Sequence, residues 1–239
     1  MKKRLTLIQM DVHVNDVEYN YNRVQELLTQ SLTENPDIIV LPETWNTGFY
    51  PSTDLINIAD NNGDRTKALL SAFTKEHNVN IVGGSVAVSK DDLVFNTSYA
   101  YNREGTLVGE YSKMHGFSPA KEDKYFASGT HTTHFELDGI PCSTVICYDI
   151  RFPELVRMAA LPGTELLFVP AQWPTMRLRH WQVLNEVRSI ENQLFVCAVN
   201  GCGTVGRVQS TGHSAVYDPW GTNLLEMDTN ECIASVDID

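Results

Sequence analysis

The sequence lacks any apolar run that approaches the roughly 20 residues of a membrane-spanning helix. It also has little positive charge, because 18 Lys and Arg residues stand against 30 Asp and Glu residues and leave a net charge of −12. Nucleic acids and anionic membranes both attract basic patches, so this balance argues against either partner. We therefore expect a protein that binds neither nucleic acid nor membrane.

Paired cysteines are missing as well, which argues against both a disulfide framework and a zinc site. His131 and His134 are too sparse to argue for a metal site, so no metal and no organic cofactor are expected. The apolar segment 5–10 is too short for the core of a signal peptide. We expect free thiols and a cytoplasmic location. The five cysteines are Cys142, Cys147, Cys197, Cys202 and Cys232.

The chain shows no repeat, no low-complexity segment and no linker, so residues 1–239 are expected to form a single domain. Helical patterns alternate with buried strand patterns, and antiparallel hairpins are inserted between them. This order indicates an α/β fold with mixed sheets and helices outside. The pattern alone leaves open whether there is one sheet or two.

Helices are expected after a cap at Asn15, where Val17, Tyr21, Val24, Leu28 and Leu32 mark one face, and at 64–77, 153–161 and 177–193. Buried faces are expected to include Leu69, Ala72 and Phe73, then Leu155, Met158, Ala159 and Leu161, then Leu178, Trp181, Leu184, Val187 and Ile190. Residues 44–61 and 114–130 are expected to be loops. Strands are expected at 5–9, 37–42, 79–88, 93–101, 106–111, 132–137, 140–147, 165–169 and 194–199, and in the tail.

Three polar residues each follow an apolar segment at its end: Glu43, Lys113 and Cys147. Because the carboxyl ends of strands form the usual ligand crevice of α/β folds, we expect these side chains to meet. A thiol needs a base to become a nucleophile, which Glu43 could supply. Lys113 could then stabilise the oxyanion that forms when a thiolate attacks a carbonyl.

Cys147 follows a strand and precedes a tight corner and a helix that begins at Pro153. Backbone N–H groups at such a corner favour negative charge, so the sequence predicts a thiolate. Two alternatives stay open. Cys147 could be a small buried apolar side chain, or it could pair with a histidine, for which His115 and His213 are the best placed.

The residues around these three positions resemble the signature blocks of the nitrilase superfamily of carbon–nitrogen hydrolases. The blocks are Leu-Pro-Glu43, Tyr-Ser-Lys113-Met-His and Cys147-Tyr-Asp-Ile-Arg-Phe-Pro-Glu, in that order. Asp218-Pro-Trp-Gly221 near the end also fits, so the resemblance covers almost the whole chain. It implies a four-layer α-β-β-α sandwich whose subunits commonly form a homodimer.

By this resemblance Cys147 is the nucleophile, Glu43 is the general base and Lys113 stabilises the oxyanion together with the Tyr148 backbone N–H. The second glutamate of the family, which positions the substrate or the base, is matched by Glu122. A plain loop carboxylate is the alternative for Glu122. The reaction that the resemblance implies is hydrolysis of an amide through a thioester, with release of ammonia.

Residues 148–153 are similar to the branch that hydrolyses small carboxylate-bearing amides. That branch includes the omega-amidases, which act on 2-oxoglutaramate and 2-oxosuccinamate, and the deaminated-glutathione amidases. Arg151 could clamp the substrate carboxylate or serve a structural ion pair, and Trp173 could line the pocket or lie in the core. Another aliphatic amidase, an ammonia-donor subunit and a non-catalytic binding protein remain alternatives.

Overall fold

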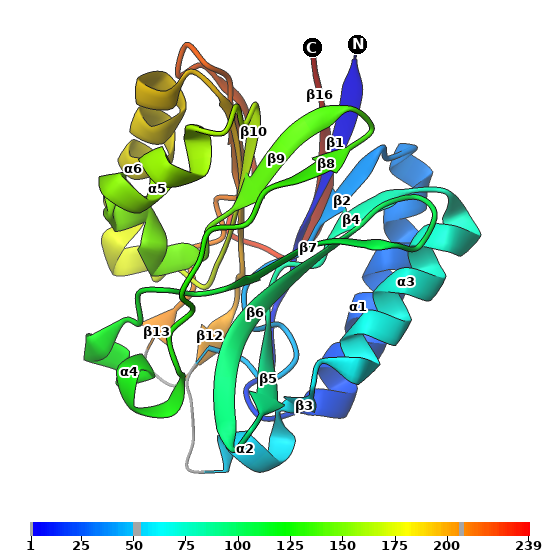
Figure 1. Ribbon diagram of the computed structural model, residues 1–239, viewed down its shortest axis with the longest axis vertical. Coiled ribbons are helices and arrows are strands. Elements are labelled where there is room, and N and C mark those ends of the chain that lie inside the picture. The colour runs from blue at the N-terminus through cyan, green and yellow to red at the C-terminus, as the bar shows by residue number, and fades with distance from the viewer. Residues whose placement is uncertain (1, 50–53, 206–207) are drawn as a thin grey trace.

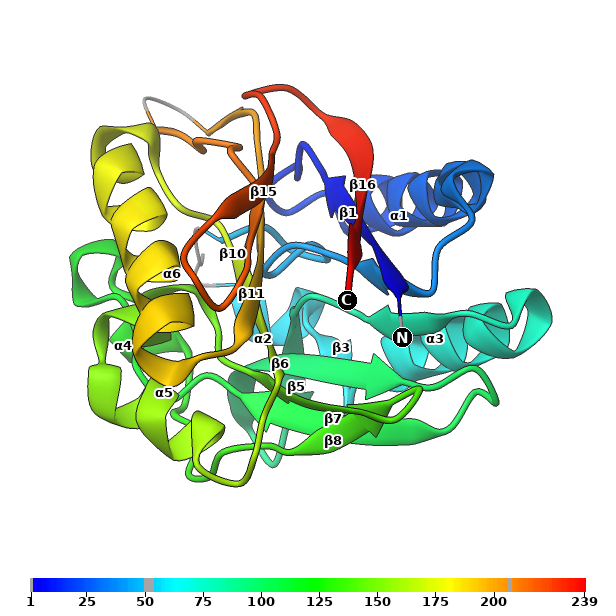
Figure 2. The ribbon, with the colours of Figure 1, turned by 90° about the horizontal axis from the view of Figure 1, so that it is seen from above.

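The computed structural model describes residues 2–49, 54–205 and 208–239. Its elements stack in four layers, with a pair of helices, two sheets and a second pair of helices (Figure 1). The four-layer α-β-β-α sandwich is therefore confirmed. Seen from above, β1 and β16 lie side by side and bring the two ends of the chain together (Figure 2). None of the described helices has the length and apolar character needed to cross a bilayer.

In the described part of the chain, the first sheet has eight strands in the order β16-β1-β2-β4-β6-β5-β3, and β7 pairs with β6. Its centre is parallel, since β2 pairs in parallel with both β1 and β4. Antiparallel hairpins complete one side. The strands are β1 (Lys3–Gln9), β2 (Ile38–Val40), β3 (Asp60–Asn61), β4 (Asn80–Val82), β5 (Val86–Lys90), β6 (Leu93–Tyr101), β7 (Leu107–Ser112) and β16 (Cys232–Ile238).

The second sheet follows the order β15-β14-β11-β10-β9-β8, and its central strands β9, β10 and β11 are parallel. A separate ribbon joins β12 and β13. These strands are β8 (Phe135–Leu137), β9 (Ile140–Thr144), β10 (Leu166–Ala171), β11 (Phe195–Asn200), β12 (Thr204–Val205), β13 (Val208–Gln209), β14 (Ala215–Tyr217) and β15 (Asn223–Glu226).

Helices α1 and α3 cover the outer face of the first sheet, and α5 and α6 cover that of the second (Figure 1). Short helices α2 and α4 lie in the two segments that were expected to be loops. The helices are α1 (Val17–Ser31), α2 (Leu55–Ile58), α3 (Asp64–His77), α4 (Glu122–Tyr125), α5 (Pro153–Ala160) and α6 (Leu178–Asn192). Single 3₁₀ turns span Leu32–Glu34, Ser118–Ala120, Cys147–Arg151 and Thr175–Arg177.

Strand alternation explains why the sheets can be buried on both faces. Leu7 of β1 belongs to the core between the sheets, whereas Ile8 packs in the core under α1 and α3. In β10, Phe168 enters the core between the sheets, and Leu167 packs in the core under α5 and α6. Successive side chains point to opposite faces, so one apolar strand serves two cores.

Several helix details differ from the expectation. The cap of α1 is Asp16, which accepts a hydrogen bond from the Tyr19 N–H, while Asn15 has φ 62°. Ala72 on α3 is exposed, and Leu69 is only partly buried. The apolar spacing was also wrong for one position in α5 and for the residue that follows the helix. Met158 and Leu161 are 56% and 74% exposed.

The expected face of α6 was wrong in part too. Val187 and Ile190 are exposed. The helix instead buries Trp181, Asn185, Arg188 and Ser189. Arg188 is buried because its guanidinium donates to the carbonyl of Ile150 at 2.9 and 3.0 Å and pairs with Glu191 at 2.7 Å. These contacts tie α6 to the turn that carries Cys147.

Candidate active site

Cys147 begins the 3₁₀ turn that follows β9, three residues beyond Thr144, where the strand ends. Its φ is +49°, a left-handed conformation that is uncommon for any residue other than glycine. Such strained positions persist only where the surroundings hold them, and they concentrate at functional sites. The thiol is 5% exposed and faces a cavity.

Asp149 holds this turn from inside. Its carboxylate accepts from the Ile146 N–H at 3.0 Å and from the Tyr111 hydroxyl at 2.7 Å. It also accepts from the backbone N–H of His115 at 2.9 Å, and the His115 ring lies 2.8 Å away. The side chain is fully buried. Asp149 thus joins the end of β7 to the strained turn and fixes the position of Cys147 relative to Lys113.

Glu43 leaves the end of β2, and its position depends on Gly84. A Cβ at Gly84 would lie 2.0 Å from the Pro42 carbonyl oxygen, and the residue has φ +60°. Only glycine lets the chain after β4 approach so closely. Ser85 then bonds both sides of Glu43, because its N–H donates to the Pro42 carbonyl at 3.0 Å and its hydroxyl accepts from the Thr44 N–H at 3.0 Å.

The Glu43 carboxylate accepts three hydrogen bonds from three different strands or strand ends. Oε1 accepts from Lys113 Nζ at 2.8 Å and from Asn96 Nδ2 at 2.9 Å, and Oε2 accepts from the Gln172 N–H at 2.8 Å. The carboxylate also lies beside the Cys147 thiol, close enough for each group to shift the pKa of the other. Glu43 is fully buried, so each of these contacts is shielded from water.

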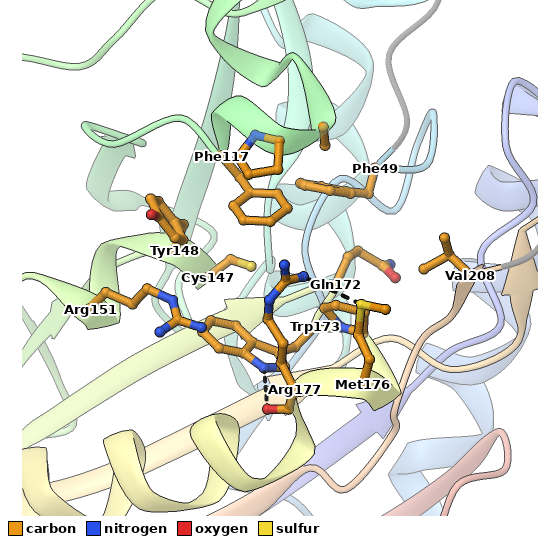
Figure 3. A pocket seen from close by; sticks show the side chains of 13 residues that line it. Phe49, Phe117, Cys147, Tyr148, Arg151, Gln172, Trp173, Met176, Arg177 and Val208 are labelled. Carbon is orange, nitrogen blue, oxygen red and sulfur yellow. Dashed lines mark hydrogen bonds between the residues drawn. The ribbon is translucent and has the colours of Figure 1, made fainter.

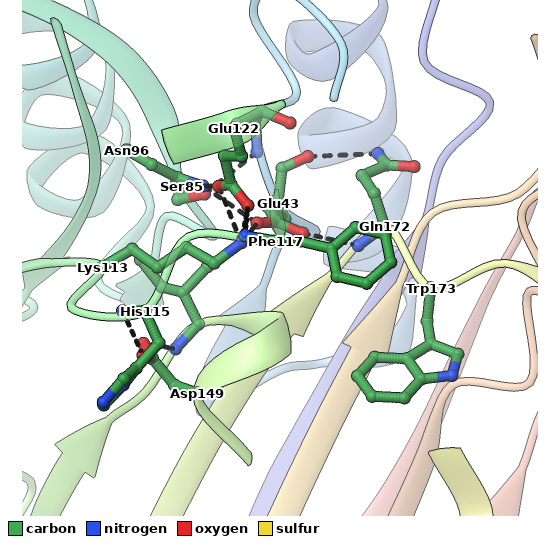
Figure 4. A network of polar contacts seen from close by, with 12 residues as sticks. Glu43, Ser85, Asn96, Lys113, His115, Phe117, Glu122, Asp149, Gln172 and Trp173 are labelled. Atoms are coloured by element: carbon green, nitrogen blue, oxygen red, sulfur yellow. Dashed lines mark hydrogen bonds and ion pairs between the residues drawn. The ribbon is translucent and has the colours of Figure 1, made fainter. Parts of the chain in front are cut away.

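Lys113 stands between two carboxylates (Figure 4). Its ammonium donates to Glu43 Oε1 and to both oxygens of Glu122, at 2.8 Å in each case. Glu122 is the first residue of α4 and also accepts from the Phe117 N–H at 2.7 Å. It is fully buried and therefore no plain loop carboxylate. The structure brings Glu43, Lys113, Glu122 and Cys147 together, as the sequence predicted.

The protonation of the site differs from the expected thiolate. Burial raises the pKa of Cys147 well above its usual range, and the Glu43 charge adds to the effect, while Lys113 opposes it. Burial also raises the pKa of Glu43, and Glu122 adds to that rise, while Lys113 opposes it. The resting cysteine is therefore a thiol whose proton can pass to Glu43. The expectation that backbone N–H groups at the corner favour the thiolate was wrong for the resting site, because burial and the Glu43 charge raise the pKa of Cys147.

The cavity in front of Cys147 has a volume of about 190 Å³, which suits a small molecule. Its wall is largely aromatic and apolar, and two arginines enter it (Figure 3). Tyr148 lies 5.1 Å from Phe117 between ring centroids. Trp173 lines the cavity and is also packed against Trp181 in the core, so both expectations for it apply.

Arg151 lines the same cavity, with its guanidinium 4.8 Å from the centroid of the Trp173 ring. Nη2 lies 3.0 Å from His180 Nδ1. Within the described ranges, no carboxylate lies within ion-pair distance of Arg151. The structural ion pair considered from the sequence is therefore not formed with any of these residues.

Neither candidate histidine supports the cysteine–histidine alternative. His115 stacks on Phe152 at 3.6 Å between centroids and bonds Asp149, and His213 Nδ1 lies 3.0 Å from Glu226. Among the described residues, no histidine lines the cavity that Cys147 faces. The group beside the thiol is Glu43.

Comparison with known proteins identifies the family of this chain. A family model described as carbon-nitrogen hydrolase matches residues 4–239. The chain belongs to the carbon–nitrogen hydrolase family. It is 40% identical to the 2-oxoglutaramate amidase of Bacillus subtilis, over 100% of this chain and 92% of that protein. It is 30% identical to an omega-amidase of Mus musculus, over 99% of this chain and 88% of that protein.

Solved structures of this family have the same fold. Nit3 of Saccharomyces cerevisiae, a member of branch 10 of the nitrilase superfamily, superposes with a TM-score of 0.90 at 26% identity, covering 100% of this chain and 90% of that one. The resemblance to the nitrilase superfamily is thus confirmed, and the chain is an amide-hydrolysing enzyme. The roles of the individual residues stay predictions.

Proposed function

We propose that this enzyme is an omega-amidase that hydrolyses 2-oxoglutaramate or 2-oxosuccinamate to the acid and ammonia. One observation carries the proposal: Cys147 lines a small cavity, and the Glu43 carboxylate, paired with Lys113 at 2.8 Å, lies beside its thiol. The similarity to 2-oxoglutaramate amidase over the full chain supports the choice of substrate. Deaminated-glutathione amidase and other aliphatic amidases are the neighbouring alternatives.

The first half of the reaction forms a thioester. Glu43 takes the proton from the Cys147 thiol as sulfur attacks the amide carbon. Lys113 and the Tyr148 backbone N–H stabilise the oxyanion. Glu43 then returns the proton to the leaving nitrogen, the C–N bond breaks and ammonia departs. Burial raises the pKa of Glu43, which makes its carboxylate a better acceptor for the thiol proton.

The second half releases the acid. Glu43 takes a proton from water, and the resulting oxygen nucleophile attacks the thioester carbon. The C–S bond breaks, and Cys147 recovers its proton from Glu43. Glu122 keeps Lys113 in place through both halves, because its two oxygens accept from the ammonium at 2.8 Å. Arg151 binds the substrate carboxylate at the other end of the cavity, and Tyr148 and Trp173 line the path between.

Residues 1–239 act as one domain in this proposal, and two copies form a homodimer in the cytoplasm. Exposed apolar side chains on α5, directly after it and on α6 support the dimer, because exposed apolar surface is common where proteins associate. They are Met158, Leu161, Val187 and Ile190. All five cysteines are free, which suits a reducing compartment. Sedimentation velocity should give twice the chain mass, and Leu161→Asp should lower it to a single chain.

The decisive variant is Cys147→Ala. It should abolish ammonia release from 2-oxoglutaramate and leave the melting temperature close to that of the wild type, since the substitution removes only the sulfur atom, which faces the cavity. Cys232→Ala, which removes a partly exposed thiol away from the cavity, is the matched control and should retain full activity. Substantial turnover by folded Cys147→Ala would contradict the mechanism.

A further inference from the structure

Two arginines enter the cavity from different segments of the chain. Arg151 ends the turn that begins at Cys147, and Arg177 ends the 3₁₀ turn before α6. Both are partly buried, and both line the cavity that Cys147 faces. Figure 3 shows the two guanidinium groups on the same side of the cavity as Trp173. The sequence drew attention to Arg151 alone.

These two arginines differ from most others in the chain. Arg23, Arg65 and Arg103 each pair with a carboxylate. Arg4 and Arg188 do the same. In the part of the chain that the structure describes, neither Arg151 nor Arg177 has such a partner, and no Asp or Glu lines the cavity. In a protein of net charge −12, two such cations beside one cavity indicate a site for an anion.

Aromatic faces hold both guanidinium groups in orientation. Arg151 lies 4.8 Å from the centroid of Trp173, and Arg177 lies 5.1 Å from the centroid of Phe117. The Trp173 indole N–H donates to the Arg177 carbonyl at 2.9 Å, so the ring that contacts Arg151 is also bonded to the backbone of Arg177. Stacking on an aromatic face leaves the N–H edge of a guanidinium available to a ligand.

The charge of Arg177 also acts against that of Arg151. Burial lowers the pKa of Arg151, and the neighbouring Arg177 lowers it further. One guanidinium can satisfy the two oxygens of a carboxylate. A second guanidinium can donate hydrogen bonds to the same ligand when the ligand has another acceptor atom beside its carboxylate. A 2-oxo acid offers one in its keto oxygen.

We propose that Arg177 and Arg151 together clamp the 2-oxo-carboxylate end of the substrate, and that this pair selects 2-oxo acid amides against α-amino amides. This inference rests on the proposed function. Glutamine has the same chain length as 2-oxoglutaramate but carries an ammonium in place of the keto oxygen. Two guanidinium groups repel that ammonium, and no carboxylate lines the described cavity to bind it.

The test compares Arg177→Gln with Arg179→Gln. Arg179 is exposed, lies two residues further along and loses the same charge when replaced. With 2-oxoglutaramate, Arg177→Gln should raise KM about 10- to 100-fold and change kcat little, because the lost contact is far from the reacting carbon. Arg179→Gln should behave as the wild type. With butyramide, a neutral amide, Arg177→Gln should change KM far less than it does with 2-oxoglutaramate, and Arg179→Gln should match the wild type.

Two further readouts separate a binding role from a structural one. In a Cys147→Ala background, Arg177→Gln should weaken binding of 2-oxoglutarate by a similar factor in calorimetry. The ratio of kcat/KM for 2-oxoglutaramate over glutamine should also fall in Arg177→Gln. An unchanged KM and an unchanged ratio would overturn the clamp and leave the proposed function standing. Wild-type enzyme that hydrolyses butyramide but not 2-oxoglutaramate would overturn both.

Discussion

Two walls meet at Cys147, and they are built differently. The inner wall consists of Glu43, Asn96, Lys113, Glu122 and Gln172, and the outer wall consists of Phe117, Tyr148, Arg151, Trp173 and Arg177. Members of the inner wall are between 0% and 7% exposed. In the outer wall only Trp173 is buried to that degree, and the other four are partly exposed.

The contacts within the walls differ as well. In the inner wall, the two carboxylates share one ammonium, and every contact is a hydrogen bond of fixed geometry (Figure 4). In the outer wall, the side chains contact one another through ring faces, as Phe117 does with Tyr148 and with Arg177, each at 5.1 Å, and as Trp173 does with Arg151 at 4.8 Å. Buried hydrogen bonds fix position, whereas ring contacts tolerate small shifts.

This difference indicates that the two walls have different functions in the reaction. Charge that develops at the reacting carbon is stabilised best by groups that are already oriented and shielded from water. The inner wall has these properties. The outer wall determines which amide reaches the thiol. Replacements in the inner wall should therefore lower kcat and shift its pH dependence, and replacements in the outer wall should change KM.

Glu122→Gln tests the inner wall and should give the larger effect. The variant keeps an acceptor for the Phe117 N–H but loses the charge that holds Lys113. A hydrogen bond to a charged group contributes about 1.5–3 kcal/mol, so kcat should fall about 10- to 150-fold with KM nearly unchanged. Steady-state kinetics on 2-oxoglutaramate measure both constants. Asp123→Asn, an exposed neighbour on α4, is the matched control and should have no effect.

The pH profile of the same variant gives an independent readout. Glu43 must be ionised to accept the proton, so kcat/KM rises with pH through the pKa of Glu43. That pKa is raised above the usual 4.5 by burial and also by the charge on Glu122, while Lys113 opposes the rise. Removing the Glu122 charge lowers the pKa of Glu43, so the acidic limb should move to lower pH. A limb that moves to higher pH would contradict the assignment of Glu43 as the base.

Much of the inner wall was predictable because its residues follow apolar strands. Glu43 and Cys147 come after β2 and β9, and Lys113 follows β7 directly. Strand ends can be recognised from the sequence, and the carboxyl ends of neighbouring strands lie at one edge of the fold. Helix α3 was predicted with its observed bounds, Asp64–His77, although only Phe73 of its three expected buried residues is buried.

The remaining residues carried no signal of this kind. Asn96 lies in the middle of β6, and its bond to Glu43 joins residues 53 positions apart. Gln172 contributes its backbone N–H, which sequence patterns do not distinguish. Arg177 gains its meaning only from its distance to Phe117 and from the absence of a carboxylate partner among the described residues. The raised pKa of Cys147 likewise depends on burial, which local sequence does not determine.

Apolar spacing also gave part of the buried face of α6 incorrectly. Val187 and Ile190 fit the spacing of Trp181 and Leu184, yet α6 turns Asn185, Arg188 and Ser189 inward instead. Arg188 can be buried because the carbonyl of Ile150 and the carboxylate of Glu191 satisfy it. A pattern that counts only apolar residues misses a polar face that is paired inside the protein.

The smallest effect is expected at Tyr148, where two replacements separate the ring from its hydroxyl. The ring contacts Phe117 and Phe152 and lies 5.7 Å from the Arg151 guanidinium. Tyr148→Leu removes these contacts, and a cation over a ring at a partly exposed site contributes about 0.5–1 kcal/mol, so KM should rise about two- to fivefold. Tyr148→Phe keeps the ring and should match the wild type within about twofold. Because the Tyr148 backbone N–H is unchanged in both variants, kcat should stay constant. A fall in kcat with Tyr148→Phe would mean that the hydroxyl takes part in the chemistry, and the division between the two walls would then fail at this residue.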